Sequence, residues 1–248
     1  MNNIHHSIKQ YLRKTGYERF ALKAVLFDMD GVLYDTMPDH ACSWEKTMKK
    51  YGLTMTANDV YLNEGRIGVD QIDVIAKRGG LTFSREERNR IYQEKTDIFM
   101  SCPPAAVMPS SLELLQKVKS RNLFAMLVTG SKQPSLINRI FNDFPDIFTR
   151  DNMVTAHDVQ HGKPHPEPYL MAILKGGLQT NEAIVVKNAP LGIESASAAG
   201  LFVIAVNTGI LPDALLLDAG ANLLFPSLNN LSIEWESIYD SLQFIAQK

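Results

Sequence analysis

The sequence of 248 residues has little of several features that mark particular classes of protein. It contains only two cysteines, Cys42 and Cys102, which lie in unrelated contexts and not in the closely spaced pairs of a zinc site. So few cysteines are typical of a reduced compartment and not of a disulfide scaffold. We therefore expect a cytoplasmic protein.

Long apolar runs and an excess of positive charge are also missing. No stretch reaches the roughly 18 consecutive apolar residues of a membrane-spanning helix. No apolar segment of the signal-peptide type follows Met1. The formal net charge is −2, with 45% hydrophobic and 21% charged residues, the balance of an ordinary globular protein. These absences argue against membrane or nucleic-acid binding.

The N-terminal residues have a helical pattern. Ile4, Ile8 and Leu12 recur at helical spacing with basic residues between them. This spacing predicts a short amphipathic helix over residues 4–18, within an N-terminal extension of residues 1–20. We expect it to be a packing element on the main body, with partner binding as the weaker alternative.

Short apolar runs of strand length alternate with helical patterns through most of the chain. The predicted strands are residues 24–27, 124–128, 184–186, 202–206 and, more weakly, 222–225. The predicted helices between them are residues 109–120, 131–142, 166–176 and 190–200. This alternation predicts an α/β fold whose core is a Rossmann-like parallel sheet.

One long segment breaks the alternation. Residues 36–102 show helical periodicity and no good strand, so we expect an inserted α-helical cap. The α/β core is then discontinuous and comprises residues 21–35 and 103–248. We place its hinges near residues 34–36 and at Pro103–Pro104, because two adjacent prolines make a stiff connection.

Polar residues follow the predicted strands where each strand ends. Ligands of open parallel sheets bind beyond the carboxyl ends of the strands, so these residues should converge on one cleft. They comprise two carboxylates, a hydroxyl, small residues and lysines: Asp28, Asp30, Thr129, Gly130, Ser131, Lys163, Lys187 and Asn188. Such a set is suited to holding a phosphoryl group.

Asp28 and Asp30 leave the first strand two residues apart, and Gly31 lets the chain turn away. A carboxylate can attack phosphorus and form an aspartyl-phosphate. A second carboxylate can protonate the leaving oxygen and later activate water. The alternative, a surface turn rich in Asp and Gly, is disfavoured because a buried strand runs directly into it.

Four motifs in this order resemble those of the haloacid dehalogenase (HAD) superfamily. They lie at residues 27–36 (Phe-Asp-Met-Asp-Gly-Val-Leu-Tyr-Asp-Thr), 128–130 (Val-Thr-Gly), 162–164 (Gly-Lys-Pro) and 188–200, which begins Asn-Ala-Pro-Leu-Gly. The resemblance covers nearly all of the chain beyond residue 22. The helical insertion resembles the cap of the β-phosphoglucomutase-like subgroup, which includes phosphatases and phosphomutases.

The resemblance implies roles for the matching residues. Asp28 would be the nucleophile and Asp30 the general acid and base. The Thr129 hydroxyl and nearby backbone N–H groups would hold the phosphoryl oxygens, and Lys163 would neutralise their charge. Mg²⁺ would be the cofactor, bound by Asp28, Asp30 and the fourth motif.

The fourth motif departs from the family pattern. One or two carboxylates normally follow the strand there, and this chain has Lys187 and Asn188 instead. Asn188 can offer an amide oxygen to the metal, but a lysine ~5 Å from Mg²⁺ would repel it by several kcal/mol at an effective dielectric of ~20. Three interpretations stay open: weak Mg²⁺ binding, lysine in place of the metal charge, or an inactive descendant.

The resemblance also implies substrate-binding residues. In the core these are Gly130 and Ser131. In the cap they are His40 and the loop residues Glu64 and Arg66, of which Arg66 can grip a second phosphate or a carboxylate with its planar fork. A solvated loop is an equally good interpretation of Glu64 and Arg66, as helix packing is of His40.

Three further residues near these motifs have simpler interpretations. Lys95 is expected to be a surface lysine of the last cap helix, although it could reach the cleft. His161 and His165 flank Lys163 and are taken as loop residues.

The leading functional hypothesis is a phosphatase that acts through an aspartyl-phosphate on a small phosphorylated metabolite or pyrophosphate. Proteins of the subgroup with similar Glu-Gly-Arg and Asn-Ala-Pro segments include inorganic pyrophosphatases. The alternatives are a sugar-phosphate mutase and, because of Lys187, a weakened phosphate-binding homologue. Dehalogenase chemistry is disfavoured because Asp30 suits proton transfer to a phosphate ester. We expect a monomer or weak dimer.

Overall fold

Six parallel strands form the centre of the computed structural model, which describes residues 3–131 and 134–245. The strand order is β3-β2-β1-β4-β5-β6. The strands are β1 (Ala24–Phe27), β2 (Phe124–Val128), β3 (Met153–Val154), β4 (Ala183–Lys187), β5 (Phe202–Val206) and β6 (Leu223–Phe225). The predicted α/β class with a parallel sheet is thus confirmed.

Helices cover both faces of this sheet, and the strands have apolar runs because both of their faces are buried. One face is covered by α1 (Ile4–Thr15), α6 (Ser111–Ser120), α7 (Pro134–Asp143) and α11 (Leu228–Phe244). The other is covered by α8 (Glu167–Gly176), α9 (Pro190–Ala198) and α10 (Asp213–Asp218). Two short 3₁₀ helices, Arg150–Asn152 and Thr180–Glu182, precede β3 and β4.

The register of the central strands sets the position of the site. In β1, Phe27 pairs with Leu127 of β2 and with Val186 of β4. The chain segments that follow these three residues therefore lie side by side at one edge of the sheet. This is the edge at which Asp28, Thr129 and Lys187 emerge.

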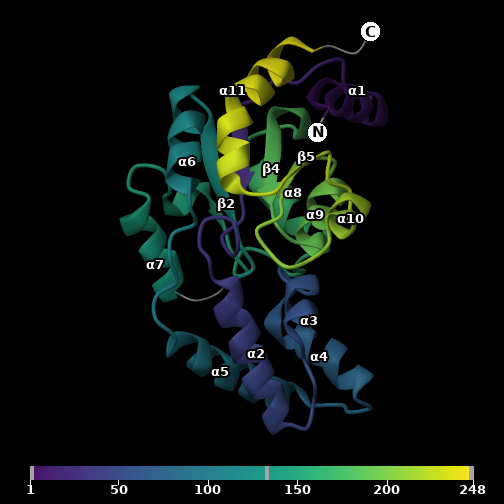
Figure 1. Ribbon diagram of the computed structural model, residues 1–248, viewed down its shortest axis with the longest axis vertical. Coiled ribbons are helices and arrows are strands. Elements are labelled where there is room, and N and C mark those ends of the chain that lie inside the picture. Colours follow the sequence, from purple (N-terminus) through teal and green to yellow (C-terminus); the bar gives the residue numbers. More distant parts are fainter. Residues whose placement is uncertain (1–2, 132–133, 246–248) are drawn as a thin grey trace.

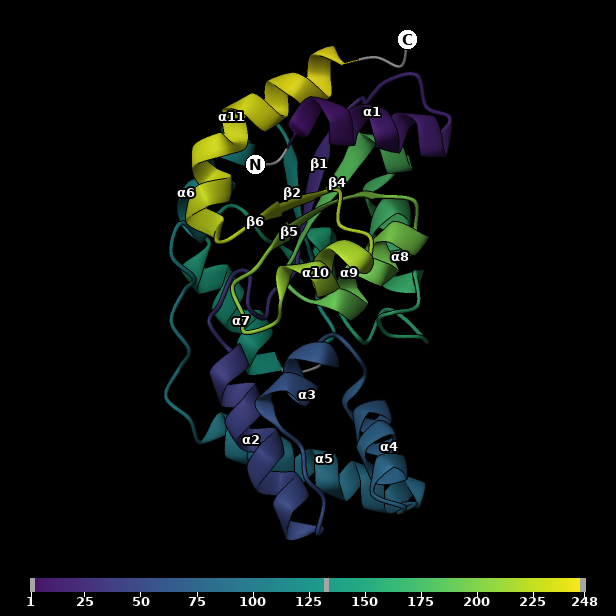
Figure 2. The ribbon, with the colours of Figure 1, turned by 45° about the vertical axis from the view of Figure 1, so that its right-hand side comes forward.

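Four helices form the cap at that edge: α2 (Met37–Lys50), α3 (Ala57–Leu62), α4 (Gly68–Arg78) and α5 (Arg85–Met100). Residues 36–102 are all described and contain no strand. The cap has its own apolar cluster, which includes Trp44, Met48 and Ile72. Figures 1 and 2 show these helices as a lobe below the carboxyl ends of the strands.

The N-terminal helix α1 packs at the opposite end of the molecule, across α11 (Figure 2). Ile8 and Leu12 are fully buried, and the Tyr11 hydroxyl donates to the Gly200 carbonyl oxygen at 2.8 Å. The helix ends before Gly16, which has a left-handed backbone (φ +78°), and so is shorter than predicted. Its expected packing role is confirmed.

Some elements differ from the sequence expectations. The two-residue strand β3 and helices α10 and α11 were not predicted, and the helix predicted over 131–142 falls partly on residues 132–133, outside the described part of the chain. No helix among the described residues is long and apolar enough to cross a membrane.

Candidate active site

Asp28 lies immediately after β1 and is 1% exposed. Each of its carboxylate oxygens contacts a different buried lysine. The Lys163 ammonium donates to Oδ1 at 2.8 Å, and the Lys187 ammonium donates to Oδ2. Lys163 also donates to the Val128 carbonyl oxygen at 3.0 Å, which ties its loop to the end of β2.

Lys187 is the last residue of β4 and is completely buried. Besides Asp28, its ammonium contacts the Glu64 carboxylate and the Asn188 amide oxygen, the latter at 3.2 Å. These three oxygens come from the end of β1, from the cap and from the turn after β4. One ammonium thus joins the sheet to the loop between α3 and α4.

The charges of this cluster balance. Burial raises the pKa of the Asp28 carboxyl, but the charges of Lys163 and Lys187 outweigh it and hold the pKa below its usual value. Burial lowers the pKa of Lys187, but the carboxylates of Asp28 and Glu64 raise it above the usual lysine value. Glu64 shares its cation with Asp28, so burial dominates there and raises its pKa to about 7.

Asp30 has a separate set of partners. Its Oδ1 accepts a hydrogen bond from the Thr36 hydroxyl at 2.6 Å and one from His40 Nε2 at 3.2 Å. Burial raises the pKa of Asp30, but the hydrogen bonds from His40 and Thr36, together with the charge of Lys187, lower it to about 2. Within the described part of the chain, both side-chain bonds use Oδ1, which leaves Oδ2 for another group.

Lys95 completes this chain of hydrogen bonds. Its ammonium lies 2.7 Å from His40 Nδ1 and can only donate, so His40 carries its ring proton on Nε2, facing Asp30. Burial, and then the charge of Lys95, lowers the pKa of His40, which keeps the ring neutral. Lys95 is 2% exposed, and burial lowers its pKa to about 8. The expectation of a surface lysine is wrong.

The loop after β2 lies between the cap and Lys163. The Thr129 hydroxyl accepts a hydrogen bond from the Ser131 backbone N–H at 3.1 Å. Gly130 lies against the cap loop, where a Cβ atom would be 3.3 Å from the Gly65 carbonyl oxygen. A Cβ on Gly65 itself, at φ +88°, would be 2.8 Å from Lys163 Cδ. Glycine at both positions allows the cap loop to close tightly over the core.

A pocket lies between the cap and the sheet. It is lined from the core by Asp30, Gly130 and Ser131, and from the cap by His40, Trp44, Glu64, Arg66, Gln71, Tyr92 and Lys95, among others. All five of the expected substrate-binding residues line it: His40, Glu64, Arg66, Gly130 and Ser131. The solvated-loop interpretation of Glu64 therefore does not hold.

Two cap residues in the pocket carry unused hydrogen-bond donors. Gln71 is 5% exposed, and its Nε2 has no hydrogen-bond partner among the described residues. Within residues 3–131 and 134–245, the Arg66 side chain is bonded only through Nε, to Asn63 Oδ1 at 3.2 Å. A buried donor without a partner is costly, so a polar ligand is favoured here.

Asp28, Lys163 and Lys187 do not line this pocket. Glu64 does line it, and also contacts Lys187. Glu64 and Lys187 thus connect the pocket to Asp28. Separation of Glu64 from Lys187 would open a route from the pocket to Asp28.

The Mg²⁺ ion implied by the resemblance competes with Lys187. Asp28 Oδ2 and Asn188 Oδ1, two of its expected ligand atoms, both contact the Lys187 ammonium. A divalent ion ~4 Å from that ammonium would be repelled by about 8 kcal/mol at an effective dielectric of ~20. With Lys187 in this position, the residues do not fit a divalent ion.

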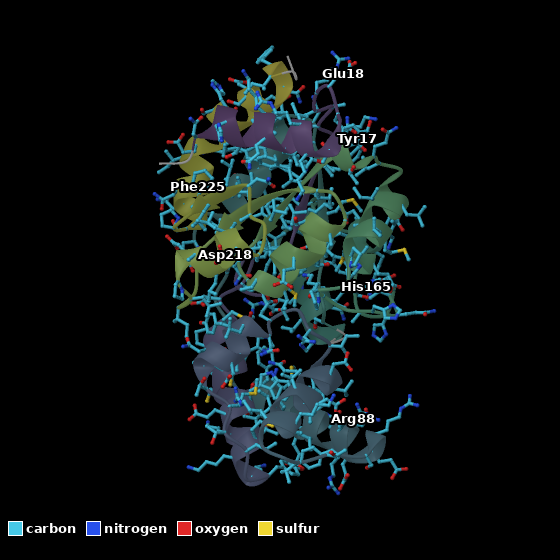
Figure 3. All side chains as sticks on the ribbon, turned by 90° about the vertical axis from the view of Figure 1, so that its right-hand side faces the viewer. Tyr17, Glu18, Arg88, His165, Asp218 and Phe225 are labelled. Atoms are coloured by element: carbon cyan, nitrogen blue, oxygen red, sulfur yellow. The ribbon has the colours of Figure 1, made fainter. Side chains whose placement is uncertain are left out.

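The histidines that flank Lys163, His161 and His165, are loop residues, as expected. His165 lies where the sheet lobe faces the cap (Figure 3). The two histidine rings pack against each other with centroids 4.6 Å apart. The Glu167 carboxylate accepts hydrogen bonds from the backbone N–H groups of Gln160 and His161, both at 2.8 Å. These contacts shape the loop that carries Lys163.

Sequence reasoning missed Thr36 and Gln71 as site residues, and it assigned Lys95 to the surface. Thr36 stands at the end of the first motif, but nothing in the sequence indicates that its hydroxyl turns back to Asp30. Gln71 is a polar residue beside Ile72 and Ile75 on the buried side of α4. A polar residue on an otherwise apolar helix face is a pattern in the sequence that could have indicated a site residue.

The chain is similar to known proteins in both sequence and fold. Residues 25–206 match the model of a family described as haloacid dehalogenase-like hydrolase. A solved structure described as "Putative beta-phosphoglucomutase from Bacteroides vulgatus" is 50% identical, with a TM-score of 0.93 over 96% of this chain and 98% of that chain.

Two curated relatives have related names. The phosphorylated carbohydrates phosphatase of Thermotoga maritima is 30% identical over 206 residues, which cover 81% of this chain and 92% of that protein. The β-phosphoglucomutase of Bacillus subtilis is 25% identical over 225 residues, which cover 86% of this chain and 93% of the relative.

Proposed function

Because the chain belongs to the haloacid dehalogenase-like hydrolase family, we propose that it is a phosphatase that hydrolyses small phosphorylated carbohydrates through a phosphoryl group on Asp28. Its enzyme class, a phosphohydrolase or phosphomutase, follows from its relatives. The proposal concerns the substrate, the reaction and the roles of individual residues.

The position of Asp28 carries the proposal. The carboxylate lies at the carboxyl end of the central strand, held at both oxygens by buried lysines beside a pocket that has unused donors. The low pKa of Asp28 keeps the carboxylate ionised and able to attack. A purely structural carboxylate would have no need of such a pocket.

The first half of the reaction forms the phosphoenzyme. When the cap loop moves aside, an Asp28 oxygen attacks phosphorus, and the bond between phosphorus and the ester oxygen breaks. The leaving oxygen takes a proton from Asp30 Oδ2 and departs as an alcohol. The ammonium of Lys163 stabilises the negative charge on the phosphoryl oxygens.

The second half releases phosphate. Water attacks phosphorus, the bond to the Asp28 oxygen breaks, and Asp30 takes up the proton that the water loses. With a pKa of about 2, Asp30 is ionised in this structure and is ready for this second step. The first step requires a protonated Asp30, and the negative charge of a bound substrate would act in that direction, because a nearby anion raises the pKa of a carboxyl.

The cap residues support a carbohydrate phosphate as substrate. Gln71 Nε2 is a neutral donor suited to a hydroxyl, and Arg66 is suited to a second anionic group. The phosphorylated carbohydrates phosphatase of Thermotoga maritima supports the same class. Pyrophosphate, the other expected substrate, offers anionic oxygens to both Arg66 and Gln71 but carries no hydroxyl.

A sugar-phosphate mutase is the second candidate. It is favoured by the 50% identity to the structure described as "Putative beta-phosphoglucomutase". A mutase would transfer the phosphoryl group from Asp28 to a second hydroxyl of the sugar and not to water. Enzymes of the family generally use Mg²⁺, and the position of Lys187 bears on that requirement in either reaction.

The test is phosphate release from a panel of hexose phosphates, glycerol phosphates and pyrophosphate by the wild type and Asp28→Asn, with Asp28→Glu as a charge-retaining control. We expect release from carbohydrate phosphates by the wild type alone, because the longer glutamate side chain of the control misplaces the attacking oxygen. Isomerised hexose phosphate without phosphate release would identify a mutase. Equal activity of Asp28→Asn and wild type would contradict the covalent mechanism.

A further inference from the structure

The surroundings of Lys187 resemble the ligand set of a cation. Its ammonium contacts a carboxylate oxygen of Asp28, a carboxylate oxygen of Glu64 and the amide oxygen of Asn188. These groups come from three separate segments and converge on one fully buried point. Carboxylate and amide oxygens in such a cluster normally bind a metal ion, and here they bind an ammonium group of the chain itself.

The fold makes room for this lysine. In α9, a Cβ atom on Gly192 would lie 2.0 Å from Lys187 Cε and 2.7 Å from its Cδ. Any other residue at position 192 would therefore displace the lysine chain. The Lys187 side chain packs against the Gly192 backbone. Its ammonium is held by oxygens of Asp28, Glu64 and Asn188.

The charge balance needs no further cation. Among the groups in direct contact, Asp28 and Glu64 supply at most two negative charges, the second only when Glu64 is ionised, and Lys163 and Lys187 supply two positive ones. A divalent ion would have to displace Lys187 and leave its charge buried without a partner, which is strongly unfavourable. The two lysines therefore neutralise the carboxylates of Asp28 and Glu64 without an added metal ion.

We propose that Lys187 is a catalytic residue that serves as the built-in cation of this site, so that phosphoryl transfer at Asp28 does not require a divalent metal. The proposal rests on the phosphatase function proposed above. In the closed state Lys187 binds Glu64 and holds the cap loop over Asp28. When substrate enters, a phosphoryl oxygen replaces the Glu64 carboxylate on the same ammonium.

This exchange follows from the chemistry of the two anions. A phosphoryl group and a carboxylate both present oxygens that accept charge-assisted hydrogen bonds from an ammonium. Glu64 lines the pocket and contacts Lys187, so its place is the one that a phosphoryl group from the pocket would take. Lys187 would thereby contact both the attacking carboxylate and the transferred group.

The experiment has one readout that does not depend on activity. Mg²⁺ is titrated by calorimetry into the wild type, Lys187→Glu, Lys187→Met and the exposed-lysine control Lys77→Met. We expect Lys187→Glu to bind Mg²⁺ at least ~10-fold more tightly than wild type, because a ligand replaces a repelling charge. Equal affinity of the two proteins would overturn the proposal. If the Lys187 variants fail to fold, stoichiometric Mg²⁺ binding by the wild type would overturn it by itself.

The second readout is phosphate release in the presence of EDTA. We expect the wild type and Lys77→Met to keep full activity and Lys187→Met to lose at least ~100-fold in kcat. Loss of wild-type activity in EDTA with recovery on adding Mg²⁺ would overturn the role of Lys187 while leaving the phosphatase function intact. Absence of hydrolysis under every condition would contradict the phosphatase function, and calorimetry would still decide whether Lys187 excludes the metal.

Discussion

The two sides of the site differ in how completely their polar groups are paired. On the sheet side, Asp28, Lys163 and Lys187 are buried, and both lysines bind the Asp28 carboxylate. On the cap side, Arg66 and Gln71 face the pocket with donors that no described residue uses. The charged groups of the sheet side are therefore already positioned without substrate, whereas the donors of the cap side are free to bind a ligand.

This difference separates chemistry from selectivity. Changes on the sheet side remove interactions with the transferred phosphoryl group and should lower kcat. Changes on the cap side remove contacts to the rest of the substrate and should raise KM first. Glu64 belongs to both sides, because it comes from the cap and binds Lys187.

The largest effect is expected for Lys163→Met. The variant removes a buried ammonium that holds Asp28 Oδ1 at 2.8 Å, so kcat should fall by about 10²–10³-fold. The control is Lys175→Met, since Lys175 also donates to backbone carbonyl oxygens, those of Arg150 and Met153, but contacts no site carboxylate. Steady-state kinetics check this prediction, and a similar loss of kcat in both variants would assign Lys163 to folding.

The pH dependence of the stability of Glu64→Gln tests the role of Glu64, the residue that belongs to both sides of the site. The folded-state pKa of Glu64 is raised from 4.5 to about 7, so its contribution to stability is fully present below pH 4.5 and is lost as pH rises through 7. Stability of the wild type relative to Glu64→Gln should therefore fall by up to about 3 kcal/mol over that window. Urea unfolding of both proteins at several pH values measures it, and a pH-independent difference would mean that Glu64 does not titrate there.

Arg66→Ala is expected to act on the cap side alone. Removing the guanidinium should raise KM for substrates with a second anionic group by about 10-fold, with kcat changed much less. Arg66→Lys keeps the charge but lacks the planar guanidinium, so its KM should lie between those of the wild type and Arg66→Ala. Kinetics with monophosphates and bisphosphates separate these cases, and equal KM values for all three proteins would assign Arg66 to solvent.

The smallest effect is expected for Gln71→Leu. It removes one neutral donor while keeping the buried volume, so KM for a carbohydrate phosphate should rise by only about 3–10-fold. Without substrate the variant should be at least as stable as wild type, because the unpartnered Nε2 is gone. Thermal unfolding and KM are both needed, and a destabilised variant with unchanged KM would make Gln71 a structural residue.

The core half of the site could be predicted from the sequence because it depends on local signals. Apolar runs indicated the central strands, and parallel strands bring their ends together, so Asp28, Thr129 and Lys187 were expected at one edge. The burial of Lys95 and the approach of Glu64 to Lys187 depend on how the cap docks onto the sheet. Such contacts join residues 55 and 123 positions apart, and no local pattern indicates them.

Strand β3 and helix α11 were missed for other reasons. Strand β3 has only two residues, which is below the length at which an apolar run can be recognised. Helix α11 has apolar residues on its inner side and polar ones outside, with a Ser227 N-cap, and its pattern was available in the sequence.

The most direct measurement is detection of a phosphoryl group on Asp28. The wild type and Asp30→Asn are mixed with a carbohydrate phosphate, quenched in acid within milliseconds and analysed by peptide mass spectrometry. We predict a phosphoryl group on the wild-type peptide that contains Asp28, and in Asp30→Asn both slower formation and slower loss of that group, because Asp30 supplies the acid of the first step and the base of the second. Release of phosphate by the wild type with no phosphorylated Asp28 in either protein would contradict this prediction.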